Sequence, residues 1–243
     1  MSKKLIGIPG WKLGENSFGI TSTYLEYFSQ FGQVITLHPG EDVRTDLDLL
    51  VLPGGKDLNP AVYGEIPGYS TSESDIHKQY FYDYKLKGYV ENGTPIFGIC
   101  LGFQMLAAFF GQKLVQNNPW HPQSDHRWGK GHKVVPIKGV ETIESETLST
   151  IIGRALKAKG YEVNSHHHQT VSMKNWNTES PLLPIHRCDE DTDTIETLCH
   201  ISLPIVAVQY HPEEFYDDFS LEVVGNLLKV KETSAPQKAV MVS

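Results

Sequence analysis

One short segment of the chain, residues 94–111, joins an apolar run to a helical pattern through a cysteine that lies between two glycines. The run that begins at Ile96 is typical of a buried strand, and the residues after Cys100 carry apolar side chains at helical spacing. Gly98 and Gly102 lie two residues before and two residues after Cys100. A nucleophile-type residue in this position, between a strand and a helix, is the pattern of a nucleophile elbow, a sharp turn that exposes the central side chain. We therefore expect a strand, an elbow and a helix in this segment.

Cys100 is a candidate nucleophile because of this setting. The start of the following helix directs its free N–H groups and the positive end of its dipole at the thiol, which favours the thiolate. The alternative is that a free cysteine is an inert, buried apolar residue, and we expect this of Cys188 and Cys199, which fall in strand patterns. The elbow separates Cys100 from those two residues.

A base and a carboxylate follow late in the chain. The apolar run 204–208 is typical of a buried strand and leads to His211, and Glu213 comes two residues later. A cysteine nucleophile needs a neighbouring base, and a carboxylate can orient the imidazole of that base. The sequence therefore predicts a catalytic triad of Cys100, His211 and Glu213.

Strand and helix patterns alternate along the first half of the chain, and shorter strand patterns follow Gly111. Such alternation predicts an α/β fold with a parallel sheet and helices on both of its faces. Ligands of these sheets bind at the carboxyl ends of the strands, where both Cys100 and His211 fall. Besides the segments already named, the expected strands are 4–8, 34–37, 47–52, 113–115, 132–137, 161–163, 182–187 and 194–199, and the expected helices are 20–31, 76–90, 147–156 and 218–230.

Four motifs together resemble those of a known family. Gly98–Gln104 and the late His211–Glu213 resemble the class I glutamine amidotransferases. Within that superfamily, Pro53–Glu65 and Asn164–Gln169 are similar to the branch of γ-glutamyl-γ-aminobutyrate hydrolases, and the match spans about residues 5–228. The resemblance implies a flavodoxin-like fold with a mostly parallel central sheet flanked by helices, and with additional short antiparallel strands.

The resemblance also implies further site residues. The backbone N–H groups of Gly55 and Leu101 would form the oxyanion hole. A plain turn is the alternative for Gly55, a solvent-facing position for the helical glutamine, and an ordinary surface or core role for each histidine. The residues that would contact or wall the substrate are Gln104, Asn164, Ser165, His167 and His168.

One helix departs from the family pattern. The family usually has an Arg-Asp pair near the start of the segment that corresponds to 76–90, and this chain has Lys78 and Gln79 there. We therefore carry over no substrate contact from this helix.

Three loops, 11–19, 56–74 and 117–131, are candidates for the walls of the site. The second exceeds the length of about 12–15 residues beyond which unstructured loops are uncommon and often functional. The third contains histidines without the close spacing of zinc ligands, and the consecutive histidines 166–168 would point to opposite faces of an extended chain. The acidic loop 188–193 lacks the ligand spacing and closing glutamate of a calcium loop. We predict no metal site and no cofactor.

The composition limits the remaining classes of function. A chain of 243 residues fits one domain, which we place at 1–230, followed by a loose tail at 231–243. A net charge of −8 without basic clusters argues against nucleic-acid binding, and no apolar run reaches the ~18 residues of a membrane span. Three cysteines without close pairing, and a start without a signal-peptide pattern, indicate a cytoplasmic protein.

Two activities share the predicted chemistry. The first is hydrolysis of a small γ-glutamyl conjugate through a glutamyl thioester. The second is a glutaminase that delivers ammonia to a synthetase on another chain, which requires a partner protein. A non-enzymatic scaffold is a third class, and the intact triad argues against it. The sequence specifies neither the leaving amine nor an oligomeric state.

Overall fold

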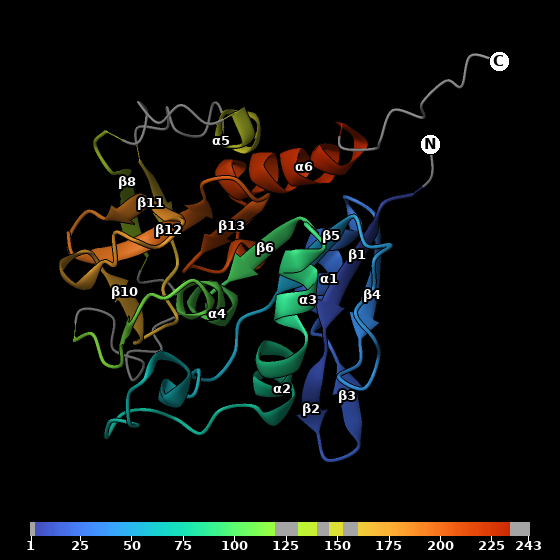
Figure 1. Ribbon diagram of the computed structural model, residues 1–243, viewed down its shortest axis with the longest axis horizontal. Coiled ribbons are helices and arrows are strands. Elements are labelled where there is room, and N and C mark those ends of the chain that lie inside the picture. The colour runs from blue at the N-terminus through green and yellow to red at the C-terminus, as the bar shows by residue number, and fades with distance from the viewer. Residues whose placement is uncertain (1–2, 120–130, 140–145, 153–159, 234–243) are drawn as a thin grey trace.

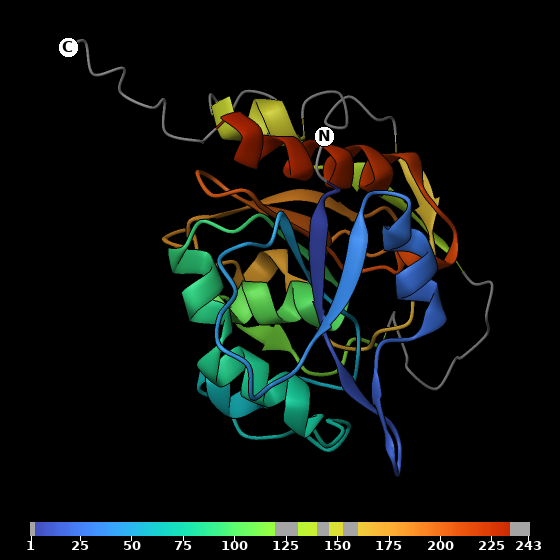
Figure 2. The same ribbon diagram turned by 90° about the vertical axis from the view of Figure 1, so that its right-hand side faces the viewer.

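The computed structural model describes residues 3–119, 131–139, 146–152 and 160–233 of the chain (Figure 1). One large sheet crosses the molecule in the strand order β4-β1-β5-β6-β13-β12-β11-β8-β9, with β10 and β7 joined beside β12. Helices lie on both sides of this sheet, as the view turned by 90° in Figure 2 also shows. The α/β fold class expected from the sequence is confirmed.

The first five strands in this order form a parallel half of the sheet. Every residue of β5, β6 and β13 is buried, because helices cover both faces and the strands are continuous apolar runs. This half delivers the site residues, since the carboxyl ends of its strands meet at one edge. Its strands are β1 (Leu5–Pro9), β4 (Gln33–Leu37), β5 (Leu49–Leu52), β6 (Ile96–Ile99) and β13 (Ile205–Val208).

The other strands form an antiparallel half that continues the same sheet from β13. Strand β10 pairs with both β12 and β7, so it joins the segment after α4 to the sheet. The two remaining cysteines lie buried on strands of this half, as expected. Its strands are β7 (Leu114–Val115), β8 (His132–Pro136), β9 (Tyr161–Val163), β10 (Thr170–Ser172), β11 (Leu182–Cys188) and β12 (Thr194–His200).

Two apolar cores lie on the two faces of the sheet. One core packs α1 (Ser22–Ser29) and α6 (Asp218–Thr233) against the sheet, with α5 (Glu146–Ile151) beside α6. The other core packs α2 (Ile76–Tyr84), α3 (Leu86–Glu91) and α4 (Leu101–Phe109) on the opposite face. In α1, the buried Tyr24, Tyr27 and Phe28 follow helical spacing and form the face that meets the sheet.

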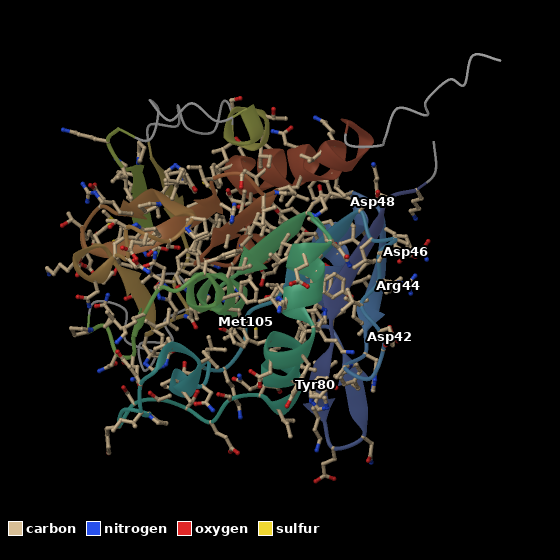
Figure 3. All side chains as sticks on the ribbon, viewed as in Figure 1. Asp42, Arg44, Asp46, Asp48, Tyr80 and Met105 are labelled. Carbon is tan, nitrogen blue, oxygen red and sulfur yellow. The ribbon has the colours of Figure 1, made fainter. Side chains whose placement is uncertain are left out.

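The segment between β4 and β5 carries several charged residues along the edge of the parallel half (Figure 3). Arg44 donates two hydrogen bonds to Asp46, over 2.9 and 2.6 Å, and both residues are exposed. Asp48 accepts a hydrogen bond from the backbone N–H of Leu5 over 2.8 Å. This bond joins the start of β5 to β1 and so helps to fix their parallel pairing.

Two sequence expectations on the site side of the molecule are wrong. Residues 11–19 form a hairpin of β2 (Trp11–Gly14) and β3 (Ser17–Gly19) rather than an irregular loop. Its strands are too short for a periodic pattern, and the contacts of Phe18 with the rings of His38 and His77 fix the hairpin against the rest of the chain. The helix expected at 76–90 is divided into α2 and α3, because Lys85 takes φ −118° between them.

Smaller differences concern the ends of elements. The loop 56–74 contains a short 3-10 helix, Pro60–Tyr63, and β10 was not expected. Helix α6 continues to Thr233, past the boundary expected at 230, and the rest of the expected tail lies outside the described residues. Most of the loop 117–131 and the end of the helix expected at 147–156 lie outside them too. Among the described helices, none is both long and apolar enough to cross a membrane.

Candidate active site

Cys100 lies at the turn between β6 and α4, with backbone angles φ 51° and ψ −100°. A positive φ costs free energy in any residue except glycine, so the surrounding fold must stabilise this turn. A Cβ on Gly98 would lie 2.8 Å from the backbone oxygen of Gly102, and a Cβ on Gly102 would overlap the backbone of Leu52. Only glycines therefore fit on either side of Cys100. Its backbone N–H donates to the carbonyl of Val208 over 2.9 Å, which joins the elbow to β13.

His211 and Glu213 follow β13, which runs parallel to β6 and next to it. Nδ1 of His211 lies 2.7 Å from Oε1 of Glu213, whose side chain is buried. Burial disfavours the charged imidazole, but the charges of Cys100 and Glu213, and hydrogen bonds to both, raise the pKa of His211 well above its usual range. The site therefore favours an imidazolium next to the cysteine.

The turn after β5 approaches this cluster from the other side. A Cβ on Gly54 would lie 2.5 Å from Cε1 of His211 and 3.4 Å from Cβ of Cys100, so this close approach requires glycine. The N–H of Gly54 donates to the hydroxyl of Tyr24 over 2.8 Å. The buried Tyr24 hydroxyl also feels the charge of Glu213, which adds to burial in raising the pKa of Tyr24. The phenol thus lies between the turn and the carboxylate of the cluster.

The two residues expected to form an oxyanion hole lie side by side. Leu101 is the first residue of α4, where helical N–H groups have no partner within the helix. Gly55 is exposed, and a Cβ placed on it would lie 3.0 Å from Cδ2 of Leu101. The N–H groups of both residues therefore belong to the backbone that borders Cys100.

Lys78 of α2 is buried in the same region, although sequence reasoning assigned it no contact. Its Nζ donates to the carbonyl oxygen of Gly54 and lies 3.9 Å from the ring centroid of Trp11. Burial lowers the pKa of Lys78 to about 8, and the charges of Asp75 and Cys100 partly oppose this effect. The only sequence signal was that Lys78 stands where the family usually has arginine.

Gln104 and Asn164, both predicted to contact substrate, make hydrogen bonds within the protein. Gln104 is buried, and its Nε2 donates to the carbonyl of Gln169 over 3.2 Å. Oδ1 of Asn164 accepts from the N–H of His211 over 2.8 Å, and Nδ2 donates to Oε2 of Glu214 over 2.7 Å. Asn164 therefore fixes the backbone at His211, and Ser165 follows it with intermediate exposure.

The three consecutive histidines point to three different partners. His166 lies with its ring centroid 5.6 Å from that of His211, so it is closest to the cluster, and sequence reasoning did not select it. Nδ1 of His167 lies 3.1 Å from the carbonyl oxygen of Gln169. Nε2 of His168 lies 3.1 Å from both carboxylate oxygens of Asp57. The last two histidines are buried and line the protein interior behind the site.

Asp57 connects two of the sequence motifs. Besides His168, it accepts hydrogen bonds from the N–H and the hydroxyl of Ser72, over 2.6 and 3.0 Å. The two ends of the loop 56–74 are thereby held together, and a small pocket beside this loop is also lined by Leu101 and Lys78. Within the described ranges, no group of three or more histidine, cysteine or acidic side chains is arranged to hold a metal.

Comparisons with known proteins follow the same direction as this geometry. The sequence pattern of the Peptidase C26 family matches residues 31–213. A protein of Lactococcus lactis, provisionally named as a glutamine amidotransferase-like protein, is 26% identical over 84% of this chain and 86% of its own length. A provisionally named glutamine amidotransferase of Mycobacterium tuberculosis is 31% identical over 83% of this chain, and the match spans 65% of that protein.

A solved structure supports the fold. It is provisionally named as a GMP synthase component from Thermoplasma acidophilum, and the match covers 96% of both chains with a TM-score of 0.59 and 18% identity. This likeness concerns the fold alone. The matched sequence pattern covers well over half of the chain, and the protein belongs to the Peptidase C26 family, with class I glutamine amidotransferase-like homologues.

Proposed function

We propose that this protein hydrolyses the γ-glutamyl amide bond of a small γ-glutamyl conjugate and releases glutamate and an amine. The observation that carries the proposal is the cluster of Cys100, His211 and Glu213 at the ends of β6 and β13. The raised pKa of His211 favours an imidazolium beside a thiolate. A thiolate paired with a base is the nucleophile by which cysteine enzymes attack acyl carbons.

The first step forms the acyl-enzyme bond. The sulfur of Cys100 attacks the side-chain carbonyl carbon of the γ-glutamyl group, a C–S bond forms, and the carbonyl oxygen becomes an oxyanion. We assign the N–H groups of Gly55 and Leu101 to this oxygen. One such donor contributes about 10²- to 10³-fold to kcat in comparable sites.

His211 then carries the protons. When the tetrahedral intermediate collapses, the C–N bond breaks and the imidazolium protonates the leaving amine, which leaves a glutamyl thioester on Cys100. Neutral His211 next takes a proton from the water that attacks the thioester, and glutamate leaves while the thiolate and imidazolium re-form. Glu213 orients the imidazole and stabilises its charged form through their 2.7 Å contact.

Recognition of the glutamyl part is assigned to the wall formed by α4 and the segment after β9. Most of these side chains already have protein partners, so we propose that they shape the wall through those bonds, with Asn164 holding the backbone of His211. The side chains of this wall are Gln104, Asn164, Ser165, His167 and His168.

A glutaminase that serves a separate synthetase is the second candidate. The Thermoplasma acidophilum protein of similar fold is provisionally named as a GMP synthase component, which favours ammonia delivery to another chain. The stand-alone hydrolase is favoured by the hydrolase-like motifs Pro53–Glu65 and Asn164–Gln169, which the Asp57–His168 pair joins. We therefore place hydrolysis of a conjugate first.

The test is amine or ammonia release from glutamine and from a panel of γ-glutamyl amides of alkylamines and amino acids. The purified chain is used alone, with Cys100→Ala as the blank. Strong turnover of one conjugate with little turnover of glutamine is the expected result, and it identifies the substrate class.

A matched control is Cys199→Ala, which removes a fully buried thiol on β12 and should keep turnover. If no compound is turned over while a glutamine-like electrophile still alkylates Cys100 quickly, the hydrolase is excluded and the glutaminase is supported. Ammonia release should then appear when the synthetase partner is added.

A further inference from the structure

The backbone of Gly54 is hydrogen-bonded on both sides by buried side chains from two different helices. Tyr24 of α1 accepts its N–H over 2.8 Å, and Lys78 of α2 donates to its carbonyl oxygen. These side chains are 5% and 4% exposed, so neither bond is exchanged freely with water. The two helices pack on opposite faces of the sheet. The turn after β5 is therefore fixed from both faces.

Lys78 is an expensive residue to bury in this place. Its direct contacts are a carbonyl oxygen and the face of the Trp11 indole, and neither carries a formal charge. Burial of an ammonium without a paired carboxylate costs free energy, which appears here as a pKa lowered to about 8. Groups buried at such a cost next to a reactive cluster are candidates for a functional role.

The orientation of one peptide group follows from the bond to Lys78. The Gly54–Gly55 peptide is trans, so its N–H points away from its C=O. A fixed Gly54 carbonyl therefore fixes the direction of the Gly55 N–H. Both residues are glycines, so this peptide would rotate more easily than others if the hydrogen bonds were absent. A charge-assisted bond to the carbonyl also polarises the peptide and strengthens its N–H as a donor.

We propose that Lys78 and Tyr24 are positioning residues that hold the Gly54–Gly55 peptide with its N–H directed at the oxyanion, so that the hole exists before substrate binds. This inference rests on the proposed function for the role of the Gly55 N–H. It adds that the hole depends on two side chains outside the triad, brought together by α1 and α2. Neither residue touches the reacting atoms.

The test compares two reactions of Cys100 that differ in their need for an oxyanion hole. Acylation by p-nitrophenyl acetate passes through a tetrahedral oxyanion, whereas alkylation by iodoacetamide needs only the thiolate. In Lys78→Met and Tyr24→Phe, we expect acylation to slow by about 10- to 100-fold, somewhat less than for a fully removed donor. Alkylation should stay within about threefold of the wild-type rate, because neither residue belongs to the Cys100–His211 pair.

Matched variants separate positioning from general damage. Tyr27→Phe removes another buried hydroxyl from α1, one without a hydrogen-bond partner among the described residues, and should leave both rates unchanged. Lys87→Met removes an exposed lysine from α3 and should do the same. Lys78→Arg keeps an N–H donor and a charge, and should recover acylation to within a few-fold of wild type.

Wild-type acylation in Lys78→Met and Tyr24→Phe would overturn the inference. Equal loss of acylation and alkylation would also overturn it, because the residues would then act on the thiolate. Both probes react without a γ-glutamyl group. If the wild-type protein is acylated by the ester but turns over no γ-glutamyl amide, the proposed function fails while the positioning role is still decided.

Discussion

The two halves of the sheet place histidines in opposite situations. At the carboxyl end of β13, in the parallel half, His211 keeps 14% of its side chain exposed and contacts two anionic groups that favour its charged form. On β11, in the antiparallel half, His186 is fully buried among the rings of Tyr161 and Phe219, and neither of its nitrogens has a hydrogen-bond partner. The same residue type is thus a proton carrier in one half and a neutral core residue in the other.

This difference shows what decides the role of a titratable residue. Strand ends of the parallel half converge at one edge, so side chains there meet charges and solvent. Residues inside the antiparallel strands meet apolar neighbours, and burial lowers the pKa of His186 to about 4. Position in the sheet, more than residue type, assigns the chemistry to the parallel half.

The largest expected effect tests whether the parallel half carries the reaction. Cys100→Ala should lower turnover of the identified substrate by about 10⁴-fold or more, and His211→Asn should cost nearly as much, because nucleophile and base act as a unit. Steady-state kinetics and thermal unfolding measure this. Retained turnover in a Cys100→Ala variant that melts like the wild type would refute the assignment.

The next effect concerns the charge that separates His211 from His186. Glu213→Gln removes a carboxylate that raises the pKa of His211, so this pKa should fall and kcat should decrease by about 10²- to 10⁴-fold. NMR titration of the His211 ring gives the pKa directly. An unchanged titration in Glu213→Gln would show that the carboxylate does not favour the imidazolium.

A smaller effect tests the contact between the loop of the parallel half and the segment after β9. His168→Asn removes the partner of the buried Asp57 and should destabilise the protein by about 1–3 kcal/mol. A looser loop 56–74 should also raise KM several-fold more than it lowers kcat. Denaturant unfolding and kinetics of His168→Asn, Asp57→Asn and the double variant measure the coupling. Additive losses in the double variant would mean that the pair is energetically independent.

The smallest effect on activity comes from the antiparallel half. Unfolded histidine has a pKa of about 6.5, and folded His186 has a pKa of about 4, so the unfolded state alone binds this proton between these values. The stability from His186 is therefore present above pH ~6.5 and is lost as pH falls towards 4, by on the order of 3 kcal/mol.

The matching variant is His186→Leu. It should flatten this part of the curve of unfolding free energy against pH, while turnover near pH 8 stays at the wild-type level. Denaturant unfolding at several pH values measures the slope. A slope identical to that of the wild type would place the acid sensitivity elsewhere in the chain.

The sequence predicted the parallel half better than the antiparallel half. The strands expected at 34–37 and 204–208 match β4 and β13 closely, because continuous apolar runs report burial on both faces without knowledge of their partners. Strand β10 has only three residues and exists through its pairing with β12 and β7. The hairpin at 11–19 likewise depends on contacts with distant rings. Such short strands have no local pattern to read.

The same division applies to the candidate site. Cys100, His211 and Glu213 could be selected because their spacing relative to strands and glycines is a local signal. Tyr24 and Lys78 could not, since they reach Gly54 only through the packing of α1 and α2. Apolar periodicity placed Tyr24 on a buried helix face, but it contained no information about the acceptor role of its hydroxyl.

The most direct test of the account is to trap the acyl-enzyme. The purified protein is mixed with its best γ-glutamyl substrate, quenched in acid within the first turnover, digested and analysed by mass spectrometry. The account predicts a glutamyl adduct on the peptide that contains Cys100, absent in Cys100→Ala and abundant enough to match the early burst of amine. Turnover at the wild-type rate with no adduct on Cys100, or with an adduct on another residue, would contradict it.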